Sequence, residues 1–247
     1  MSGAHQGQVR QAPAAQGTDA SPGLAAGLRE ATRALHRRAE RSGVIQRILN
    51  RQADRFAYAL LLRNLLPVYR QLEAGLRRRA AEPGVRHIVE PRLFRAEALA
   101  ADLVAIGGAE WAGVLPLLAA GEAYRRRVAL AAERAAGGLI AHAYVRYLGD
   151  LNGGRLLRGL LVEQLGLGDA ALAFYRFPRI PDPAAFSAGF RRALDRAGTE
   201  LGDEGPIVEE AVAAFRLNIA LSEAVARRVS ASGLRGFAST PLPSGLP

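Results

Sequence analysis

A histidine and a glutamate four positions apart, His36 and Glu40, lie in the segment LREATRALHRRAE, residues 28–40. Residues at this spacing share one face of a helix, so Glu40 can accept a hydrogen bond from one ring nitrogen of His36. The other ring nitrogen is then a neutral acceptor, which is the form of imidazole that binds a metal ion. The alternative is that His36 is an ordinary residue at the boundary of the core. The other histidines, at positions 5, 87 and 142, add no close metal-binding spacing, which disfavours a site built from several histidines.

A second candidate lies in AYVRYLGDLNGGRLLRGLL, residues 143–161, where glycines interrupt an apolar helical pattern. An interior glycine costs roughly 1 kcal/mol relative to alanine, so Gly149, Gly153 and Gly154 together oppose the helix by about 3 kcal/mol. Gly149 and Gly153 are four residues apart and therefore share one face, which carries no side chains. That face permits either close packing of another helix or the approach of a large flat ligand to a bent helix. The neighbouring Asp150 is expected to be either solvated or turned toward the same cavity.

The composition limits the classes of protein to which this chain can belong. The chain has 247 residues, is 49% hydrophobic and has no cysteine, so it can bury a sizeable core but cannot form a disulfide, a thiolate metal site or a thiol nucleophile. No apolar run is long enough for a membrane span and no secretory signal is recognisable, which predicts a cytoplasmic protein. The 33 basic residues are all arginine, and the net charge of +10 favours acidic partners.

Apolar positions at helical spacing predict an all-α chain, with no convincing alternating strand and no internal repeat. A cap at Ser21 followed by Pro22 predicts the start of the first helix, and Pro67 predicts a kink in the second. A proline-stiffened linker, FYRFPRIPDP, covers residues 174–183. The predicted helices span residues 21–40, about 53–79, 92–106, 111–135, 137–166, 182–197 and 205–230.

The two ends of the chain differ in composition from the rest. The segments 1–20 and 233–247 are rich in small and polar residues or in proline and have no helical periodicity, so they are predicted to be disordered tails. One helical domain, residues 21–232, is expected between them.

The ordered set of segments resembles one family. LREATRALHRRAE and AHAYVRYLGDLNGGRLL, in this order in an all-helical chain, resemble the two signature segments of heme oxygenase. AFYRFP and AFRLNIALSEAV resemble later segments of the same family, so the resemblance covers roughly residues 24–228. It implies a helical bundle that holds heme between the first helix and a glycine-kinked distal helix. Heme would be both substrate and cofactor, cleaved at a meso carbon with dioxygen and external electrons to biliverdin, carbon monoxide and ferrous iron.

The resemblance also implies roles for residues on the distal helix. Gly149 and Gly153 would give backbone contact to heme and leave space for dioxygen. Asp150 would anchor ordered water molecules that hydrogen-bond the oxygen and direct it to the meso carbon rather than to peroxidase-like chemistry. The residues implied to complete this network are Tyr69, Arg146 and Asn218.

On the other face of heme, His36 would be the proximal iron ligand, with Glu40 polarising its ring. The remaining residues that the resemblance places against heme are Arg29, Arg33 and Arg191 as propionate partners, Tyr144 as a hydroxyl donor, and Phe215. Ser187 stands where the family often has lysine, so one propionate anchor is expected to be missing. The meso carbon that is attacked therefore stays open, with the alpha position as the family default.

Other functions remain as alternatives. A heme carrier or sensor on the same fold would share His36 and the glycines but would not need Asp150 and its network. Relatives that process thiamin-like compounds need a cysteine nucleophile, which this chain lacks. No recognition-helix motif supports nucleic-acid binding. The predicted partners are heme and an acidic electron donor such as a ferredoxin, a flavodoxin or a reductase, and the predicted state is a monomer.

Overall fold

The helix α3, Arg55–Arg78, forms the centre of the core and is buried along almost its whole length. It begins at Asp54, whose side chain accepts a hydrogen bond from the Ala57 backbone N–H at 2.7 Å. The helix runs unbroken through Pro67, where the sequence predicts a kink. Around α3 pack α6, α4 and α10, so its apolar residues are covered on several sides.

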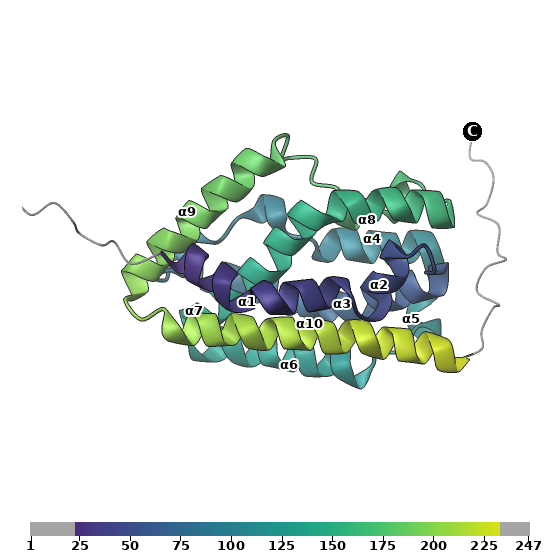
Figure 1. Ribbon diagram of the computed structural model, residues 1–247, viewed down its shortest axis with the longest axis horizontal. Coiled ribbons are helices and arrows are strands. Elements are labelled where there is room, and N and C mark those ends of the chain that lie inside the picture. Colours follow the sequence, from purple (N-terminus) through teal and green to yellow (C-terminus); the bar gives the residue numbers. More distant parts are fainter. Residues whose placement is uncertain (1–22, 233–247) are drawn as a thin grey trace, which may run out of the picture.

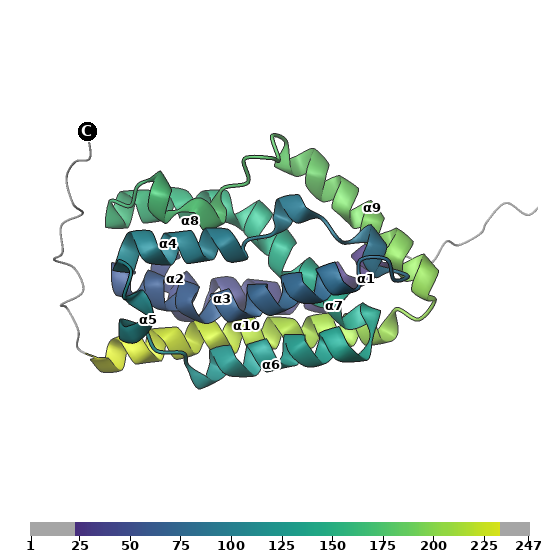
Figure 2. The same cartoon turned by 180° about the vertical axis from the view of Figure 1, so that it is seen from behind.

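The computed structural model describes residues 23–232, which are helical nearly throughout and contain no strand in that range (Figures 1 and 2). The α-helices besides α3 are α1 Leu24–Glu40, α2 Gly43–Leu49, α4 Ala96–Gly107, α5 Trp111–Val114, α6 Ala119–Arg134, α7 Ala136–Ala143, α8 Gly149–Leu165, α9 Pro183–Leu201 and α10 Gly205–Ser232. Shorter turns are η1 Val85–His87, η2 Pro91–Leu93, η3 Tyr144–Leu148, η4 Asp169–Ala171 and η5 Ala173–Tyr175. The predicted all-α fold class is confirmed.

The long helix α10 extends along one side of the molecule, with α1 and α6 beside it (Figure 1). On the opposite side lie α4 and α8, and α9 closes one end (Figure 2). None of the helices within residues 23–232 is long and apolar enough to cross a membrane.

The start of α1 is held by a residue far away in sequence. The predicted cap at Ser21 and Pro22, and both predicted tails, lie outside the described residues. Within them, α1 begins at Leu24 after Gly23, which makes no side-chain cap. The carboxylate of Asp195, on α9, instead accepts a hydrogen bond from the Ala25 N–H at 2.9 Å. This contact ties α9 to α1 at the helix terminus where unpaired N–H groups point outward.

The predicted helix 137–166 is helical along nearly its whole length, but its middle is not regular α-helix. The chain forms α7, then the π-helical turn η3, and then α8, and its path bends there, as the resemblance implies for the distal helix (Figure 1). Such turns are rare and occur often at functional sites. Two further differences are that α2 was not predicted and that the predicted helix 111–135 is divided into α5 and α6. The predicted linker 174–183 lies in the connection between α8 and α9, which has no α-helix from residue 166 to 182; its last residue, Pro183, begins α9.

Candidate functional site

Four side chains from four elements form one hydrogen-bonded network beneath α8. The hydroxyl of Tyr69, on α3, donates to one carboxylate oxygen of Asp150 on α8. Arg146, in the η3 turn, donates to the Tyr69 hydroxyl at 2.9 Å and to the other oxygen of Asp150 at 3.0 Å. Its remaining terminal nitrogen donates to the side-chain oxygen of Asn218, on α10, at 2.5 Å. The structure thus brings together all four residues that the resemblance assigned to one network.

The backbone explains how residues so close in sequence meet in this way. Arg146 and Asp150 are four apart, so in regular helix they share a face. The π-helical turn Tyr144–Leu148 carries Arg146 into the core, where it is only 7% exposed, and Asp150 is buried to the same degree. Tyr69 is fully buried on α3 and supplies the hydroxyl that bridges both charged groups.

Burial sets the electrostatics of this network. It raises the pKa of the Asp150 carboxyl above its usual range, although Arg146 and the Tyr69 hydroxyl oppose that shift. Burial alone would lower the pKa of Arg146, but Asp150 and Tyr69 outweigh it and the pKa is raised. Burial likewise raises the pKa of Tyr69 well above its usual value. Tyr69 and Arg146 are therefore fixed donors at neutral pH, and Asp150 accepts from both.

The glycines of α8 separate into two kinds. A Cβ atom placed on Gly149 or Gly153 would meet no atom within 4 Å, so these two residues face open space. A Cβ on Gly154 would lie 2.7 Å from the Tyr175 ring, so that glycine is needed for close packing. Packing therefore explains Gly154, while the helix-to-helix explanation is wrong for Gly149 and Gly153. Their lack of side chains instead keeps a surface of backbone accessible.

His36 is accessible on α1. Its side chain is 55% exposed, and its Nδ1 lies 3.5 Å from a carboxylate oxygen of Glu40. The edge of the ring contacts Phe215 on α10, with 6.0 Å between the ring centroids. Glu40 on one side and Phe215 on another limit the orientations of the ring, while Nε2 is free to bind a ligand.

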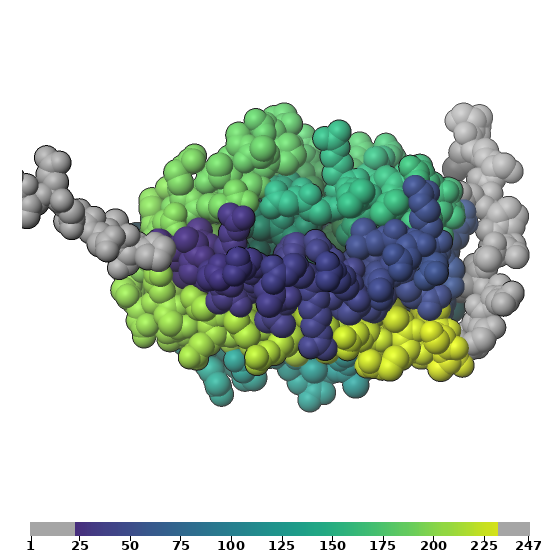
Figure 3. Space-filling model, in the orientation of Figure 1, coloured from purple at the N-terminus to yellow at the C-terminus, as the bar shows by residue number. Residues whose placement is uncertain are grey.

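Between α1 and α8 the surface is hollowed (Figure 3). The two segments come together where the Tyr144 hydroxyl lies 3.3 Å from the Thr32 hydroxyl, one turn before His36 and a little over one turn before Gly149. Beyond that contact α1 packs mainly on α10 and α8 packs on η5, while α2 and α9 each pack against both α1 and α8. We refer to this hollow, with His36 on α1 and Gly149 and Gly153 on α8, as the α1–α8 groove.

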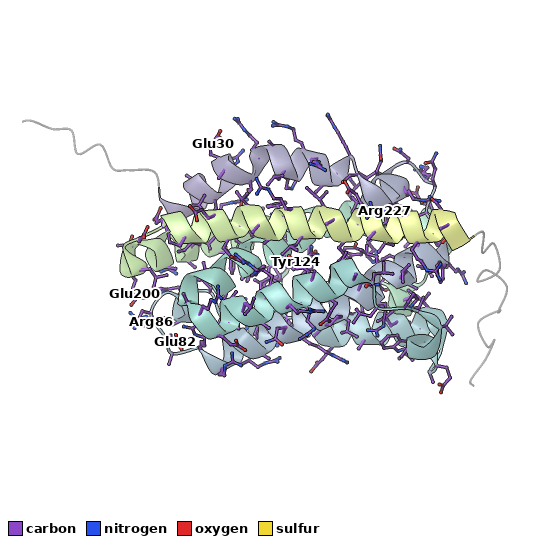
Figure 4. All side chains as sticks on the ribbon, turned by 90° about the horizontal axis from the view of Figure 1, so that it is seen from below. Glu30, Glu82, Arg86, Tyr124, Glu200 and Arg227 are labelled. Atoms are coloured by element: carbon purple, nitrogen blue, oxygen red, sulfur yellow. The ribbon has the colours of Figure 1, made fainter. Side chains whose placement is uncertain are left out.

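The basic residues assigned to propionates lie on α1 and α9, which pack against each other. Arg29, Arg33 and Arg191 are all exposed, and Arg33 also pairs with Glu30 at 2.7 Å. Glu30 points away from the body of the molecule (Figure 4), so this pair is at the surface. The exposed guanidinium groups of α1 and α9 are therefore available to bind an anionic ligand.

Ser187 has a partner inside the protein. Its side chain is buried and its hydroxyl donates to the side-chain oxygen of Asn152 on α8 at 2.9 Å. A serine in this setting supplies no positive charge and fastens α9 to α8.

Two aromatic residues next to the network were not singled out by the sequence. The ring of Phe174 contacts that of Tyr69 edge-on, with 5.5 Å between centroids, and Tyr175 packs against Gly154. Both belong to the segment AFYRFP, which the sequence identifies only as part of a linker and of the family resemblance. The sequence pattern around Gly154 does not show that an aromatic ring packs against it, so only the fold reveals this contact.

Together these features define an all-helical protein with an accessible histidine and a bare glycine face on opposite sides of a ligand groove, and a buried charged network behind that face. The family model for heme oxygenase matches residues 22–224. The chain therefore belongs to the heme oxygenase family.

Individual relatives agree with that membership. Heme oxygenase 1 of Synechocystis sp. is 34% identical over 220 residues, which cover 89% of this chain and 92% of the relative. Heme oxygenase 1 of Nostoc sp. is 36% identical over 200 residues, covering 81% and 84%. The crystal structure of the Synechocystis heme oxygenase-1 in complex with heme matches with a TM-score of 0.80, covering 87% of this chain and 98% of that one.

Proposed function

We propose that this protein cleaves heme to biliverdin, carbon monoxide and ferrous iron, using dioxygen and electrons from another protein. The observation that carries the proposal is the pairing of an open glycine face with a buried carboxylate behind it. A Cβ atom added to Gly149 or Gly153 would meet no atom within 4 Å, and the buried Asp150 lies between them in sequence. A flat ring fits the α1–α8 groove because backbone, rather than side chain, lines one wall.

His36 is the residue proposed to hold the heme iron. Its exposed ring can reach a ligand in the groove, and Glu40 lies near Nδ1, which leaves Nε2 as the binding nitrogen. Phe215 against the ring edge limits its rotation. When bound, heme supplies both the iron that reduces dioxygen and the porphyrin ring that is cut.

Asp150 is proposed to control where oxygen reacts. Both of its oxygens are already hydrogen-bonded, to Tyr69 and to Arg146, so its orientation is fixed. A carboxylate fixed in this way can hold ordered water molecules in the open space beside Gly149 and Gly153. Asn218 completes the arrangement by accepting from Arg146 on the side away from Asp150. The network thus presents a preorganised polar surface on the side of the groove opposite His36.

The exposed cations of α1 and α9 are proposed to bind the heme carboxylates. Arg29, Arg33 and Arg191 offer planar donor groups that match a carboxylate, and the Tyr144 hydroxyl adds a neutral donor. Because Ser187 contributes no charge there, the rotation of heme in its plane, and with it the meso carbon that is cut, depends on the arginines and on Tyr144.

The partner is proposed to be an acidic electron donor such as a ferredoxin, a flavodoxin or a reductase. The support is the net charge of +10 and the row of exposed arginines on α1. A monomer in the cytoplasm is the state proposed for the functioning protein.

Replacing Asp150 tests the proposed role of the network. Asp150→Asn keeps the shape and one acceptor oxygen, whereas Asp150→Ala removes both acceptors and leaves Arg146 without its charged partner. We expect both variants to bind hemin with an unchanged Soret band and to form biliverdin at least about tenfold more slowly than the wild type. The measurement is a single-turnover assay with ascorbate in air, followed at the absorption of biliverdin. Undiminished biliverdin formation in both variants would contradict the proposed role of Asp150.

A further inference from the structure

A buried carboxylate outside the groove fastens the segment that supports α8. Asp102, on α4, is fully buried and uses both of its oxygens. One oxygen accepts a hydrogen bond from the Ala173 N–H at 2.7 Å and the other from the Phe174 N–H at 2.9 Å. These are the first two residues of the η5 turn, Ala173–Tyr175. The position of η5 relative to α4 is therefore set by two charge-assisted hydrogen bonds.

The η5 turn in turn contacts the functional site from behind. The Tyr175 ring fills the space that Gly154 leaves on the inner face of α8, where a single added carbon would lie 2.7 Å from it. The same ring stacks on Tyr58 of α3, with 6.3 Å between centroids. The Phe174 ring contacts Tyr69, the donor to Asp150, edge-on. A shift of η5 would thus move both the inner face of α8 and the side chain that orients Asp150.

We propose that Asp102 is a positioning residue. It holds η5 so that Tyr175 fixes the position of α8 relative to α3 and Phe174 fixes the orientation of the Tyr69 ring. This role rests on the proposed heme cleavage, because it concerns the same network. It differs from the roles of the groove residues, since Asp102 lies on α4 and acts through the backbone of residues 173–174.

The electrostatic setting of Asp102 supports this role. Burial raises the pKa of the Asp102 carboxyl to about 6, although the two backbone N–H groups and Arg95 oppose the shift. The other titratable groups facing it are the hydroxyls of Tyr58 and Tyr175. Below about pH 6 the carboxyl gains a proton and one oxygen becomes a donor, so one of the two N–H groups loses its acceptor.

Hydrogen exchange of the full-length protein, before and after hemin is added, measures how well the backbone amides of η5 and α8 are protected, and it does not rely on turnover. In the variant Asp102→Asn, we expect faster exchange in peptides covering 172–177 and 149–165, with unchanged exchange in α6. The matched control is Asp182→Asn, because Asp182 also accepts from two backbone N–H groups, those of Ala184 and Ala185, but at the exposed start of α9. We expect that control to leave exchange in 149–165 unchanged.

Turnover provides the second readout. We expect Asp102→Asn to lower kcat for biliverdin formation by about tenfold while the apparent KM for hemin changes less than twofold, since α1 and α9 carry the binding cations. Unchanged exchange in 149–165, or an equal rise in exchange over the whole chain, would overturn the positioning role. If wild-type protein forms no biliverdin, the proposed function fails, and the exchange result still decides whether Asp102 positions α8.

The wild type alone gives a test that does not depend on any variant folding. After correction for intrinsic exchange rates, protection of 172–177 should fall as pH decreases from about 7 to about 5 and recover on return. Protection that is constant over this range would contradict the role of the ionised carboxylate of Asp102.

Discussion

At the residue scale, the proposed heme binding depends most on His36, because one ring nitrogen of this residue is proposed to bind the iron. Replacing His36 with alanine removes this nitrogen and leaves the fold unaffected, since the side chain is 55% exposed. We expect His36→Ala to lose biliverdin formation and to regain part of it when imidazole is supplied in solution. The measurement is the ascorbate-driven assay with and without imidazole, together with the Soret spectrum.

A second histidine provides the control for that experiment. His87 pairs with Glu200 at 3.1 Å, and Glu200 lies beside Arg86 at one end of the molecule (Figure 4). His87→Ala should therefore leave the Soret spectrum and the turnover unchanged. Full activity of His36→Ala without imidazole would show that the iron is held by another residue.

At the element scale, the glycines of α8 allow stability to be separated from function. Gly149→Ala and Gly153→Ala should each stabilise the protein by about 0.5–1 kcal/mol, because alanine favours helix and the added methyl group meets no neighbour. The same methyl groups enter the α1–α8 groove, so we expect weaker hemin binding or slower biliverdin formation. Urea unfolding and the hemin titration measure the two effects separately.

Two further glycines of α8 serve as controls for this prediction. Gly159 also faces open space, so Gly159→Ala should stabilise the helix and leave turnover unchanged. Gly154→Ala should destabilise the protein, since its methyl group would clash with the Tyr175 ring. If Gly149→Ala and Gly153→Ala behave like Gly159→Ala in the activity assay, the open glycine face has no role in heme binding or cleavage.

The element scale also shows what sequence could and could not predict. The predicted bounds of helices with a regular apolar face, such as α3 and α9, agree with the structure to within a few residues, because local periodicity defines them. The π-helical turn was not predicted, since Tyr144–Leu148 has the apolar spacing of ordinary helix. Local patterns also carry no information on contacts between residues distant in sequence, such as that of Asp195 with the start of α1.

The residues of the candidate site also differ in whether local sequence patterns could identify them. His36 and the two open glycines could be found from residue type and spacing, while Tyr69 and Asn218 were found only through the family resemblance. Asp102 escaped both routes, because an aspartate within AEALAADLVAIG looks like a solvated helix residue. Its burial depends on the return of residues 173–174 to α4, which is a property of the fold.

At the scale of the whole molecule, a partly buried charged cluster links three helices. Glu210 on α10 accepts hydrogen bonds from Arg127 on α6 and contacts His142 Nε2 on α7 at 2.9 Å. Tyr124 lies in the same interior, between α6 and α10 (Figure 4), and its ring is 5.7 Å from that of His142. The cluster therefore contributes to the packing of α6, α7 and α10.

This cluster predicts a pH dependence of stability. Burial would raise the pKa of Glu210, but His142 and Arg127 outweigh it and lower the pKa to about 2. Because the folded pKa lies below that of the unfolded chain, the stabilisation is complete above about pH 4.5 and is lost as pH falls toward about 2. Glu210→Gln should cost about 1–2 kcal/mol near neutral pH, and this cost should shrink by about pH 3.

Urea unfolding at several pH values measures this difference, with Glu209→Gln as the matched control on the exposed face of α10. The control should match the wild type at every pH. A cost of Glu210→Gln that is the same at neutral and acid pH would contradict the assignment of charge to this cluster.

One optical experiment tests whether the α1–α8 groove binds heme and whether the protein cleaves it. Purified protein is titrated with hemin, and ascorbate is then added in air with an iron chelator present. We expect a saturable Soret band that decays after ascorbate is added while the absorption of biliverdin grows. A Soret band that forms and then persists without any bilin would contradict heme cleavage and would identify a heme carrier or sensor on the same fold.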